Sequence, residues 1–451
     1  MRVSRLTQMV FEHQRWEAAY VKANDKHIDL KVLKQLADPK NRVRLYLTIL
    51  TEQIEIPPCY MELQEKDTPG EYRTVYVAEP EWRVILSIIN SCLFELFGDM
   101  VHPQCRSYLS GESCGKTVTE VSDAMVKLSK NIKYKKFARK YDFKSYFDCV
   151  ALQAILDVFD ELERRLGFEP NTEPLINLLR KFYKSTLVFD LDGNLIEQYM
   201  GIRQGVSCAS FLADVVLYEL DDFMTKKYKY YWRYSDDLIC FAENVDEITE
   251  DINRIIHKYG VRLNDRKTQD LYTDSYYKFL GFDLCGDSIM LSSRRVKKFT
   301  KEIVARTIAK PWITPNQARE SIKRYMYGDG DGYSWATSCF SALRNCDEDI
   351  LVLDKFVMDA LRLVEVRHKY NQERKRKGLK PRKMKWGFKE IGGIGIVNNS
   401  STNRLVRSTG TKVGTGLERT EKEIDNYLTI GCLLKNYKTD KQVYQTCVRS
   451  M

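Results

Sequence analysis

Two adjacent carboxylates, Asp236 and Asp237, lie between two β-rich segments of the chain. The segment before them is polar and aromatic, and the segment after them, residues 238–242, is apolar. This pattern favours a tight β-hairpin that carries both acids at its tip. An aspartate pair by itself is weak evidence, because acidic turns and helix caps are common, and Asp221-Asp222 is a second such pair in this chain.

A third carboxylate strengthens the pattern. Asp142 ends an apparent strand over residues 136–143 and leads into a helical segment. Nucleotidyl transfer uses two divalent cations, one at the attacking 3′-hydroxyl and one at the departing pyrophosphate. Mg²⁺ prefers carboxylate oxygens and keeps several waters, so carboxylates from two neighbouring strands suffice. We therefore expect Asp142, Asp236 and Asp237 to bind two Mg²⁺ ions, with Mn²⁺ as a possible substitute, if their strands lie side by side.

Five short motifs follow one another along residues 141–282. They are Tyr-Asp-Phe-Lys-Ser-Tyr-Phe-Asp at 141–148, Gly-Ile-Arg-Gln-Gly-Val-Ser at 201–207, Tyr-Ser-Asp-Asp at 234–237, Leu-Asn-Asp-Arg-Lys-Thr at 263–268 and Phe-Leu-Gly-Phe at 279–282. In order and spacing they resemble the palm motifs of the reverse transcriptases, which are RNA-directed DNA polymerases. The resemblance covers about residues 70–290.

The resemblance implies an α+β fold, a right-hand polymerase with fingers, palm and thumb, in which helices flank an antiparallel palm sheet. Changes in composition place boundaries near residues 70, 290 and 370. With the resemblance, they imply an N-terminal helical segment (1–70), fingers and palm (71–290), a helical thumb (291–366) and a basic, mainly helical C-terminal extension (367–451). Periodicity predicts a strand at 72–77, a hairpin over 187–198, and helices over 84–97, 117–131, 152–166 and 211–223.

The resemblance also implies roles for single residues. Asp142, Asp236 and Asp237 would hold the catalytic metals, and Lys267 would protonate the departing pyrophosphate. Phe147 matches the family's steric gate, a ring that clashes with a ribose 2′-hydroxyl and so favours deoxynucleotides. A plain core aromatic is the alternative for Phe147, and a surface lysine on a turn is the alternative for Lys267.

Other matched residues would contact substrates. Arg73 would bind the triphosphate, since a guanidinium fork suits phosphate oxygens, and Arg83 is a second candidate that could instead be structural. Gln204 and Gly205 would lie against the incoming nucleotide and template, where glycine permits close backbone approach. The last motif would form the primer grip, with residues Phe279, Leu280 and Gly281.

The chain departs from the common pattern in two ways. Most intron-type and retroelement relatives carry proline in place of Arg203. No nuclease, RNase H or integrase constellation follows residue 290. A solitary polymerase with its own C-terminal extension resembles the bacterial defence-associated reverse transcriptases, the abortive-infection and unknown-group lineages. This resemblance implies a role in antiphage defence, with a structured noncoding RNA as partner and template, dNTPs as substrates and DNA as product.

The charge distribution agrees with a nucleic-acid partner. The formal net charge is +10, and residues 367–385 contain ten Lys and Arg but a single acid, Glu373. Such side chains neutralise phosphates without reading sequence, and Tyr370 and Trp386 could stack on unpaired bases. A solvated helix face is the alternative. The candidate RNA contacts are Arg374, Lys375, Arg376, Lys377, Arg382 and Lys383.

Several other classes of protein are disfavoured. The sequence has no signal peptide and no run of about 18 apolar residues, so we expect a cytoplasmic protein without a membrane span. Its twelve cysteines include no Cys-x-x-Cys pair, which argues against a zinc site. Residues 111–117, Gly-Glu-Ser-Cys-Gly-Lys-Thr, are one residue short of a Walker phosphate loop, so we do not expect an ATP site there.

Two alternatives stay open. The palm chemistry would be the same in an untemplated or protein-primed DNA polymerase, whereas Phe147 disfavours an RNA-dependent RNA polymerase. A catalytically silent RNA-binding scaffold is the alternative from a different class. Clustered carboxylates argue against the scaffold, because like charges placed close together cost stability unless cations bind. The template, the primer and the oligomeric state do not follow from the sequence.

Overall fold

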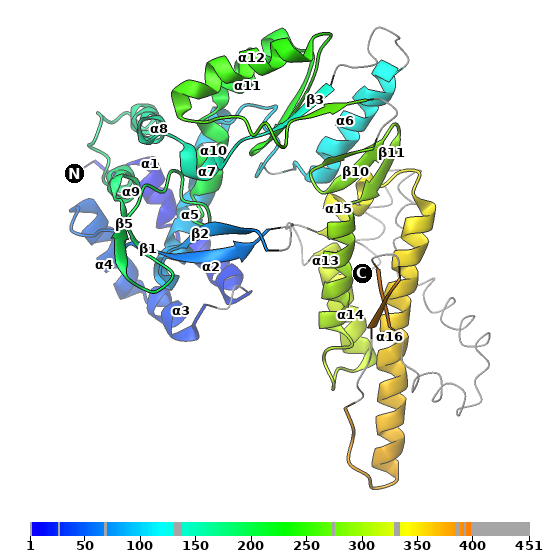
Figure 1. The fold of residues 1–451 in the computed structure, drawn as a ribbon. Helices are drawn as coiled ribbons and strands as arrows, with labels where there is room; N and C mark the ends of the chain where they lie inside the picture. Colours follow the sequence, from blue (N-terminus) through cyan, green and yellow to red (C-terminus); the bar gives the residue numbers. More distant parts are fainter. Residues whose placement is uncertain are drawn as a thin grey trace. The chain divides into compact units, whose positions relative to one another are not determined.

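The computed structural model describes residues 2–25, 28–66, 70–109, 111–129, 138–272, 276–328, 334–383, 388–391 and 394–397. The chain divides into two compact units. The first comprises Met1–Glu112 and Lys136–Leu271, and the second comprises Ser113–Lys135 and Tyr272–Met451. Figure 1 shows the elements of both units, which are described separately below.

Helices at the N-terminus of the first unit surround one long, buried helix. They are α1 (Arg5–Val10), α2 (His13–Asp25), α3 (Leu30–Ala37) and α4 (Pro39–Leu50), and the long helix is α5 (Pro80–Phe97). Helix α5 starts at a proline, which suits a first helical turn, and nine of its apolar residues are buried. They form a broad apolar face, which is typical of a helix that packs into a core. Here α5 packs against α1, α2, α3 and α10.

A four-stranded sheet in the first unit has the order β2-β1-β4-β5. Its strands are β1 (Cys59–Glu65), β2 (Tyr72–Val77), β4 (Leu187–Phe189) and β5 (Leu195–Glu197). Strand β2 and the β4–β5 hairpin match the predicted elements. Strand β1 was not predicted, because its Met, Glu, Leu and Gln residues favour helices. Its pairing with β2 on one side and β4 on the other overrides that preference.

The second sheet of the first unit carries the acidic motifs and has the order β6-β7-β3-β8. Its strands are β3 (Ala138–Asp142), β6 (Tyr230–Tyr234), β7 (Asp237–Phe241) and β8 (Gln269–Leu271), and all neighbours run antiparallel. The predicted mixture of helices with antiparallel sheets is confirmed. The arrangement of fingers, palm and thumb stays a prediction.

Helices α7 (Tyr146–Cys149), α8 (Leu152–Arg165), α9 (Pro174–Lys184), α10 (Ala209–Val215), α11 (Tyr218–Lys227) and α12 (Val245–Ile256) complete the first unit, with short 3₁₀ turns at Gly98–Met100 and His257–Tyr259. Figure 1 shows α11 and α12 side by side. The single helix predicted over 211–223 is wrong. Leu217, with φ −98° and ψ 19°, leaves the helical conformation and separates α10 from α11.

The second unit combines helices with a small sheet. Its elements are α6 (Cys114–Ser129), β9 (Tyr277–Phe279), β10 (Phe282–Cys285), β11 (Ser288–Leu291), α13 (Ser293–Arg306), α14 (Pro315–Tyr327), α15 (Trp335–Ser338), a 3₁₀ turn (Phe340–Ala342), α16 (Asp347–Arg376), β12 (Phe388–Ile391) and β13 (Ile394–Val397). Helix α16 packs against α13 and α14 (Figure 1). The antiparallel β12–β13 pair differs from the mainly helical extension that we predicted, and residues 398–451 lie outside the described part. In the part of the chain that is described, no helix has the length and apolar character needed to cross a membrane.

Candidate active site

Two strands of the second sheet bring the predicted metal ligands together. Asp142 is the last residue of β3, and it lies opposite Asp237, the first residue of β7. The pair Tyr234 and Asp237 closes the hairpin, so Ser235 and Asp236 form its two-residue turn. Ser235 has φ 56°, the left-handed conformation that tight hairpin turns require. The turn therefore holds Asp236 next to the facing pair of carboxylates.

Burial and neighbouring negative charges raise the pKa of Asp236 and of Asp237. Burial raises the pKa of Asp236, and the charge of Asp142 raises it further. Burial raises the pKa of Asp237 to about 7, with a further contribution from the neighbouring Asp236. Both pKa shifts have two causes: burial removes water from the carboxylates, and neighbouring negative charges disfavour ionisation. A bound cation would relieve this repulsion.

The turn after residue 263 holds Asp142 in place. The side-chain Nδ2 of Asn264 donates to Asp142 Oδ1 at 3.1 Å, and its backbone N–H donates to the Asp142 carbonyl at 2.8 Å. Lys267 Nζ donates to Asp142 Oδ2 at 2.9 Å. Burial lowers the pKa of Lys267, but the hydrogen bond and the charge of Asp142 outweigh it, so the pKa is raised. Asn264 was not among the predicted site residues, although it stands in the same motif as Lys267.

The donor set is that of a hard divalent cation, because it consists of carboxylate oxygens. Among the residues that the structure describes, no group of three or more His, Cys, Asp or Glu side chains has the arrangement of a metal site. Both carboxylate oxygens of Asp142 already accept hydrogen bonds, from Asn264 and Lys267. The residues therefore fit a metal by the chemistry of their oxygens, and each oxygen of Asp142 keeps a second lone pair that could bind a cation.

The other predicted nucleotide contacts meet at the segment Met200–Ser207, here called the nucleotide loop. Ile202 N–H donates to the carbonyl of Phe147, the predicted steric gate, at 2.7 Å. The carbonyl of Gln204 accepts from Tyr76 N–H of β2 at 2.7 Å. A Cβ at Gly205, which has φ 105°, would lie 2.8 Å from the Tyr76 carbonyl oxygen, so this approach requires glycine. The loop thus links the helix of Phe147 to strand β2.

Arg73 lies on β2, three residues before Tyr76, and its Nε donates to Gln64 Oε1 at 2.9 Å. Burial and Asp142 raise the pKa of Asp236, and the positive charge of Arg73 slightly opposes that rise, so Arg73 lies within electrostatic range of the acidic turn. The first unit thus brings together the three aspartates, Lys267, Phe147, Gln204, Gly205 and Arg73.

The comparisons with known proteins bear on this arrangement. Residues 63–284 match the model of a family described as reverse transcriptase (RNA-dependent DNA polymerase). The match spans the three aspartates, Lys267 and the nucleotide loop. Residues 63–284 form a reverse transcriptase domain. The match agrees with the predicted enzyme class, RNA-directed DNA polymerase and hence nucleotidyltransferase.

Solved telomerase structures resemble the chain at low identity. Apo telomerase from Candida tropicalis is 13% identical, with 70% of this chain and 61% of that chain covered and a TM-score of 0.43. Its form truncated from the C-terminal domain is 17% identical, with 55% and 59% covered and a TM-score of 0.38. Telomerase from Candida albicans in complex with a TWJ fragment of telomeric RNA is 13% identical, with 70% and 61% covered and a TM-score of 0.38. This chain spans about three fifths of these structures' length. No curated protein matches it.

A buried polar network supports the acidic turn of the reverse transcriptase domain. Ser235 N–H donates to Ser107 Oγ at 2.9 Å, and Ser107 Oγ donates to Asp214 Oδ1 at 2.6 Å. Arg233 donates to the Asp214 carbonyl and forms an ion pair with Asp221, in which both side chains are fully buried. Asp221 thus stabilises the β6 strand. Sequence patterns gave no signal for this role of Ser107, because Asp214 and Ser235 are more than 100 residues away from it.

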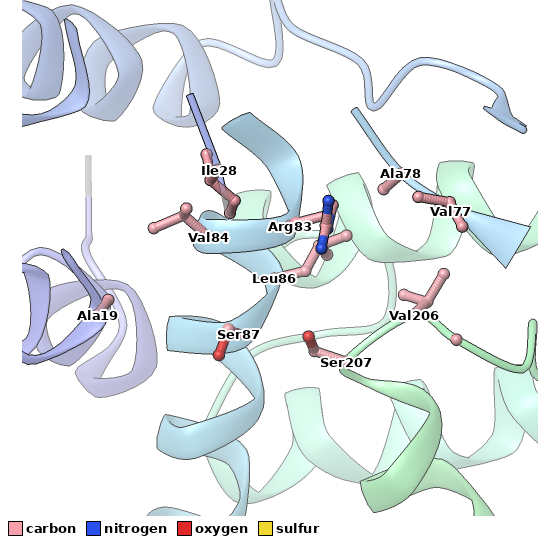
Figure 2. A pocket seen from close by; sticks show the side chains of 11 residues that line it. Ala19, Ile28, Val77, Ala78, Arg83, Val84, Leu86, Ser87, Val206 and Ser207 are labelled. Carbon is pink, nitrogen blue, oxygen red and sulfur yellow. The ribbon is translucent and has the colours of Figure 1, made fainter. Parts of the chain in front are cut away.

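A cavity of about 260 Å³ lies beside the nucleotide loop. In Figure 2, Ser87 of α5 and Ser207 of the loop both line the cavity, and the Arg83 side chain extends from α5 toward the side of Val77 and Val206. Arg83 is half-buried, and it lines this cavity. Its predicted contact with a triphosphate stays a prediction.

The predicted primer grip belongs to the second unit. Leu280 and Gly281, with φ 48° and 77°, form the turn between β9 and β10. Phe279 is buried in strand β9, as a core residue of a strand would be. Arg295 of α13 donates to the Leu280 carbonyl at 2.7 Å and stacks over the Phe282 ring at 4.4 Å. The turn is therefore held by α13.

From Ser113 on, the Walker-like residues belong to the second unit. Gly115 lies inside α6, and a Cβ there would lie 2.7 Å from the carbonyl oxygen of Ser338. This glycine is needed for close packing of α6 against Ser338.

The basic segment begins at the end of α16. Lys375, Arg376, Lys377, Arg382 and Lys383 are exposed and Arg374 is half-buried. Arg367, the first cation of the segment, is buried at 2% exposure and donates to the carbonyls of Ile308 and Lys310. It is therefore structural and unable to contact RNA. Trp386 lies outside the described residues.

Proposed function

We propose that this chain makes DNA on an RNA template by two-metal nucleotidyl transfer, with Asp142, Asp236 and Asp237 as the metal ligands. The observation that carries the proposal is the register of β3 and β7, which sets Asp142 opposite Asp237 beside the acidic turn. When bound there, two Mg²⁺ ions, or Mn²⁺ in their place, would activate the primer's 3′-hydroxyl and stabilise the departing pyrophosphate.

The chain's own residues would do the rest. Lys267 Nζ, whose pKa is raised, carries a proton at neutral pH and could transfer it to the leaving pyrophosphate. The Phe147 ring would exclude a ribose 2′-hydroxyl, and its carbonyl is fixed by Ile202. Arg73 would bind the triphosphate with its guanidinium group.

Replacing Asp236 and Asp237 together with alanine tests the proposal. Primer extension with dNTPs and Mg²⁺ on an RNA template should fall to background, while RNA binding measured by filter retention stays near that of the unmodified chain. The pair Asp157 and Asp160 on α8, replaced in the same way, serves as the control for loss of two acids. Undiminished synthesis by the Asp236/Asp237 variant would disprove the assignment, and inactivity of the unmodified chain would favour a silent RNA-binding scaffold.

We further propose that the fingers, palm and thumb are arranged as in other right-hand polymerases, that the basic extension binds RNA, and that the protein is a cytoplasmic antiphage enzyme dedicated to one structured noncoding RNA. The exposed cations at 375–377 and 382–383 support the RNA contact.

Purifying the protein from its host and sequencing the bound nucleic acids tests the dedicated template. One abundant structured RNA with complementary DNA is expected. Homopolymeric or protein-linked DNA would favour the untemplated or protein-primed alternative, and unrelated RNAs would contradict a dedicated template.

A further inference from the structure

We infer that Arg203 is a positioning residue, whose side chain fixes the nucleotide loop and thereby sets how strictly the site rejects ribonucleotides. The inference rests on the proposed polymerase function. The Arg203 side chain contacts residues at the end of α9, so it would act on the site through Ile202 and Gln204 on either side of it.

The Arg203 side chain is buried at the end of α9, with 1% of the residue exposed. Its Nη2 donates to the carbonyl of Ser185, the residue that ends α9, at 2.6 Å. Its guanidinium carbon lies 3.9 Å from the ring centroid of Phe182 and 5.5 Å from that of Tyr183. A cation at the carboxyl end of a helix is stabilised by the helix dipole and by the free carbonyls there. The guanidinium therefore has one defined orientation.

Charge pairing does not explain this burial. In the described part of the chain, no carboxylate forms an ion pair with Arg203, and its Nε has no hydrogen-bond partner. The neighbouring thiol of Cys59 has a pKa raised by burial to about 11, so it is neutral at physiological pH. A buried cation without an anion is a poor source of stability. The contribution of Arg203 is therefore mainly geometric: a flat stacked group with one directed hydrogen bond.

The loop needs such an anchor because of its backbone. Gly201, Arg203 and Gly205 have φ values of 53°, 62° and 105°, so three of five consecutive residues are in the left-handed region. A left-handed conformation is disfavoured for a residue with a side chain such as Arg203. From Gly205 on, the loop lines the cavity shown in Figure 2, so fewer neighbouring side chains pack against it there. Contacts elsewhere must hold the loop in this shape.

The position of the loop determines where the predicted substrate contacts lie, because the loop is hydrogen-bonded to them or contains them. Next to Arg203, Ile202 N–H holds the Phe147 carbonyl at 2.7 Å, and a Cβ on Gly201 would lie 2.1 Å from the same oxygen. On the other side, the Gln204 carbonyl is bound to Tyr76 of β2. A shift of the loop would therefore move the predicted steric gate and Gln204 together, and small displacements of this kind are costly at a reacting centre.

The test compares three substitutions in the full chain. Arg203→Met keeps the length and the buried volume but removes the planar charge and the bond to Ser185. We expect its KM for dNTP to rise roughly tenfold and its preference for dNTP over rNTP to fall roughly tenfold, with a smaller change in kcat. Arg203→Lys retains a cation that can reach the Ser185 carbonyl and should restore part of both values. Arg203→Pro should abolish activity, because proline cannot adopt a φ of 62°.

Arg180→Met is the matched control. Like Arg203, Arg180 is a buried arginine, but it lies on α9 itself and is paired with the buried Glu163. Arg180→Met should lower the melting temperature more than Arg203→Met does, because it breaks a buried ion pair. It should leave the preference for dNTP over rNTP unchanged. Unchanged KM and unchanged selectivity in Arg203→Met would overturn the inference while leaving the polymerase proposal intact. Equal loss of selectivity in both variants would also overturn it, since a general loss of stability would then be the cause. An unmodified chain that incorporates no dNTP would overturn both proposals.

Discussion

Lys267 Nζ lies 2.9 Å from Oδ2 of Asp142, so the proposed proton donor is bound to a proposed metal ligand. The same carboxylate accepts from Asn264 through its other oxygen. The two hydrogen bonds fix the orientation of Asp142 before any metal or substrate is present.

The first prediction concerns Lys267 itself. Lys267→Met should lower kcat about 10² to 10⁴-fold, the usual contribution of a positioned acid, and should leave the dissociation constant of RNA nearly unchanged. Single-turnover incorporation on a fixed primer and template measures the chemical step. Asn264→Ala is the companion variant, because it removes the other bond to Asp142 without removing a proton donor. Its loss of kcat should be smaller, and an equal loss would assign Lys267 a purely orienting role.

The second prediction concerns Phe147. Its ring is half-buried and packs edge-on against Tyr146, with ring centroids 5.6 Å apart. Phe147→Val should raise the efficiency of rNTP incorporation at least tenfold, because the clash with the 2′-hydroxyl is removed. The efficiency with dNTP should stay within a fewfold of the original. The ratio of kcat/KM for one matched pair of nucleotides is the measurement, and an unchanged ratio would return Phe147 to a structural role.

The third prediction concerns Asp214 beneath the acidic turn. Burial raises its pKa to about 7, against the opposing effects of the Arg233 charge and the hydrogen bonds from Ser107 and Cys105, while the charge of Asp221 raises it. A carboxyl whose pKa is higher in the folded than in the unfolded protein contributes stability below its unfolded pKa. That contribution disappears as the pH rises toward 7.

Asp214→Asn removes this titration and keeps a carbonyl oxygen that can accept from Ser107. The free energy of unfolding of the variant, relative to the unmodified chain, should therefore improve steadily between about pH 4 and pH 7 and then level off. Denaturant titrations at four pH values across this range provide the measurement. A difference that does not change with pH would show that Asp214 does not titrate in the folded protein.

The sequence predicted the catalytic strands well because their signals are local. Strand β3 and the β6–β7 hairpin follow from β-rich residues on either side of the acidic positions, and the predicted ends were within about two residues. Strand β1 was missed, since its residues favour a helix and its strand conformation depends on partners at 72–77 and 187–189. Arg203 was noticed only as an unusual residue. The role that we infer for it depends on contacts with Phe182, Tyr183 and Ser185 at the end of α9, which no local pattern connects to residue 203.

The last prediction concerns the basic segment. Lys375, Arg376, Lys377 and Lys383 are exposed. Lys377 forms an ion pair with Glu373, but this pair is at the surface and therefore contributes little to stability. Replacing the four cations with alanine should weaken RNA binding and reduce the slope of log K against log salt, by about 0.7 for each phosphate that is no longer neutralised.

The control variant replaces four exposed cations of α3 and α4 with alanine: Lys31, Lys34, Lys40 and Arg44. Both variants lose the same formal charge, so a general electrostatic effect would change both binding curves alike. A reduced slope in the first variant alone would place phosphate contacts at the end of α16 and in the residues after it. Equal slopes in both variants and the unmodified chain would mean that these cations form a solvated surface, and that the RNA is bound elsewhere.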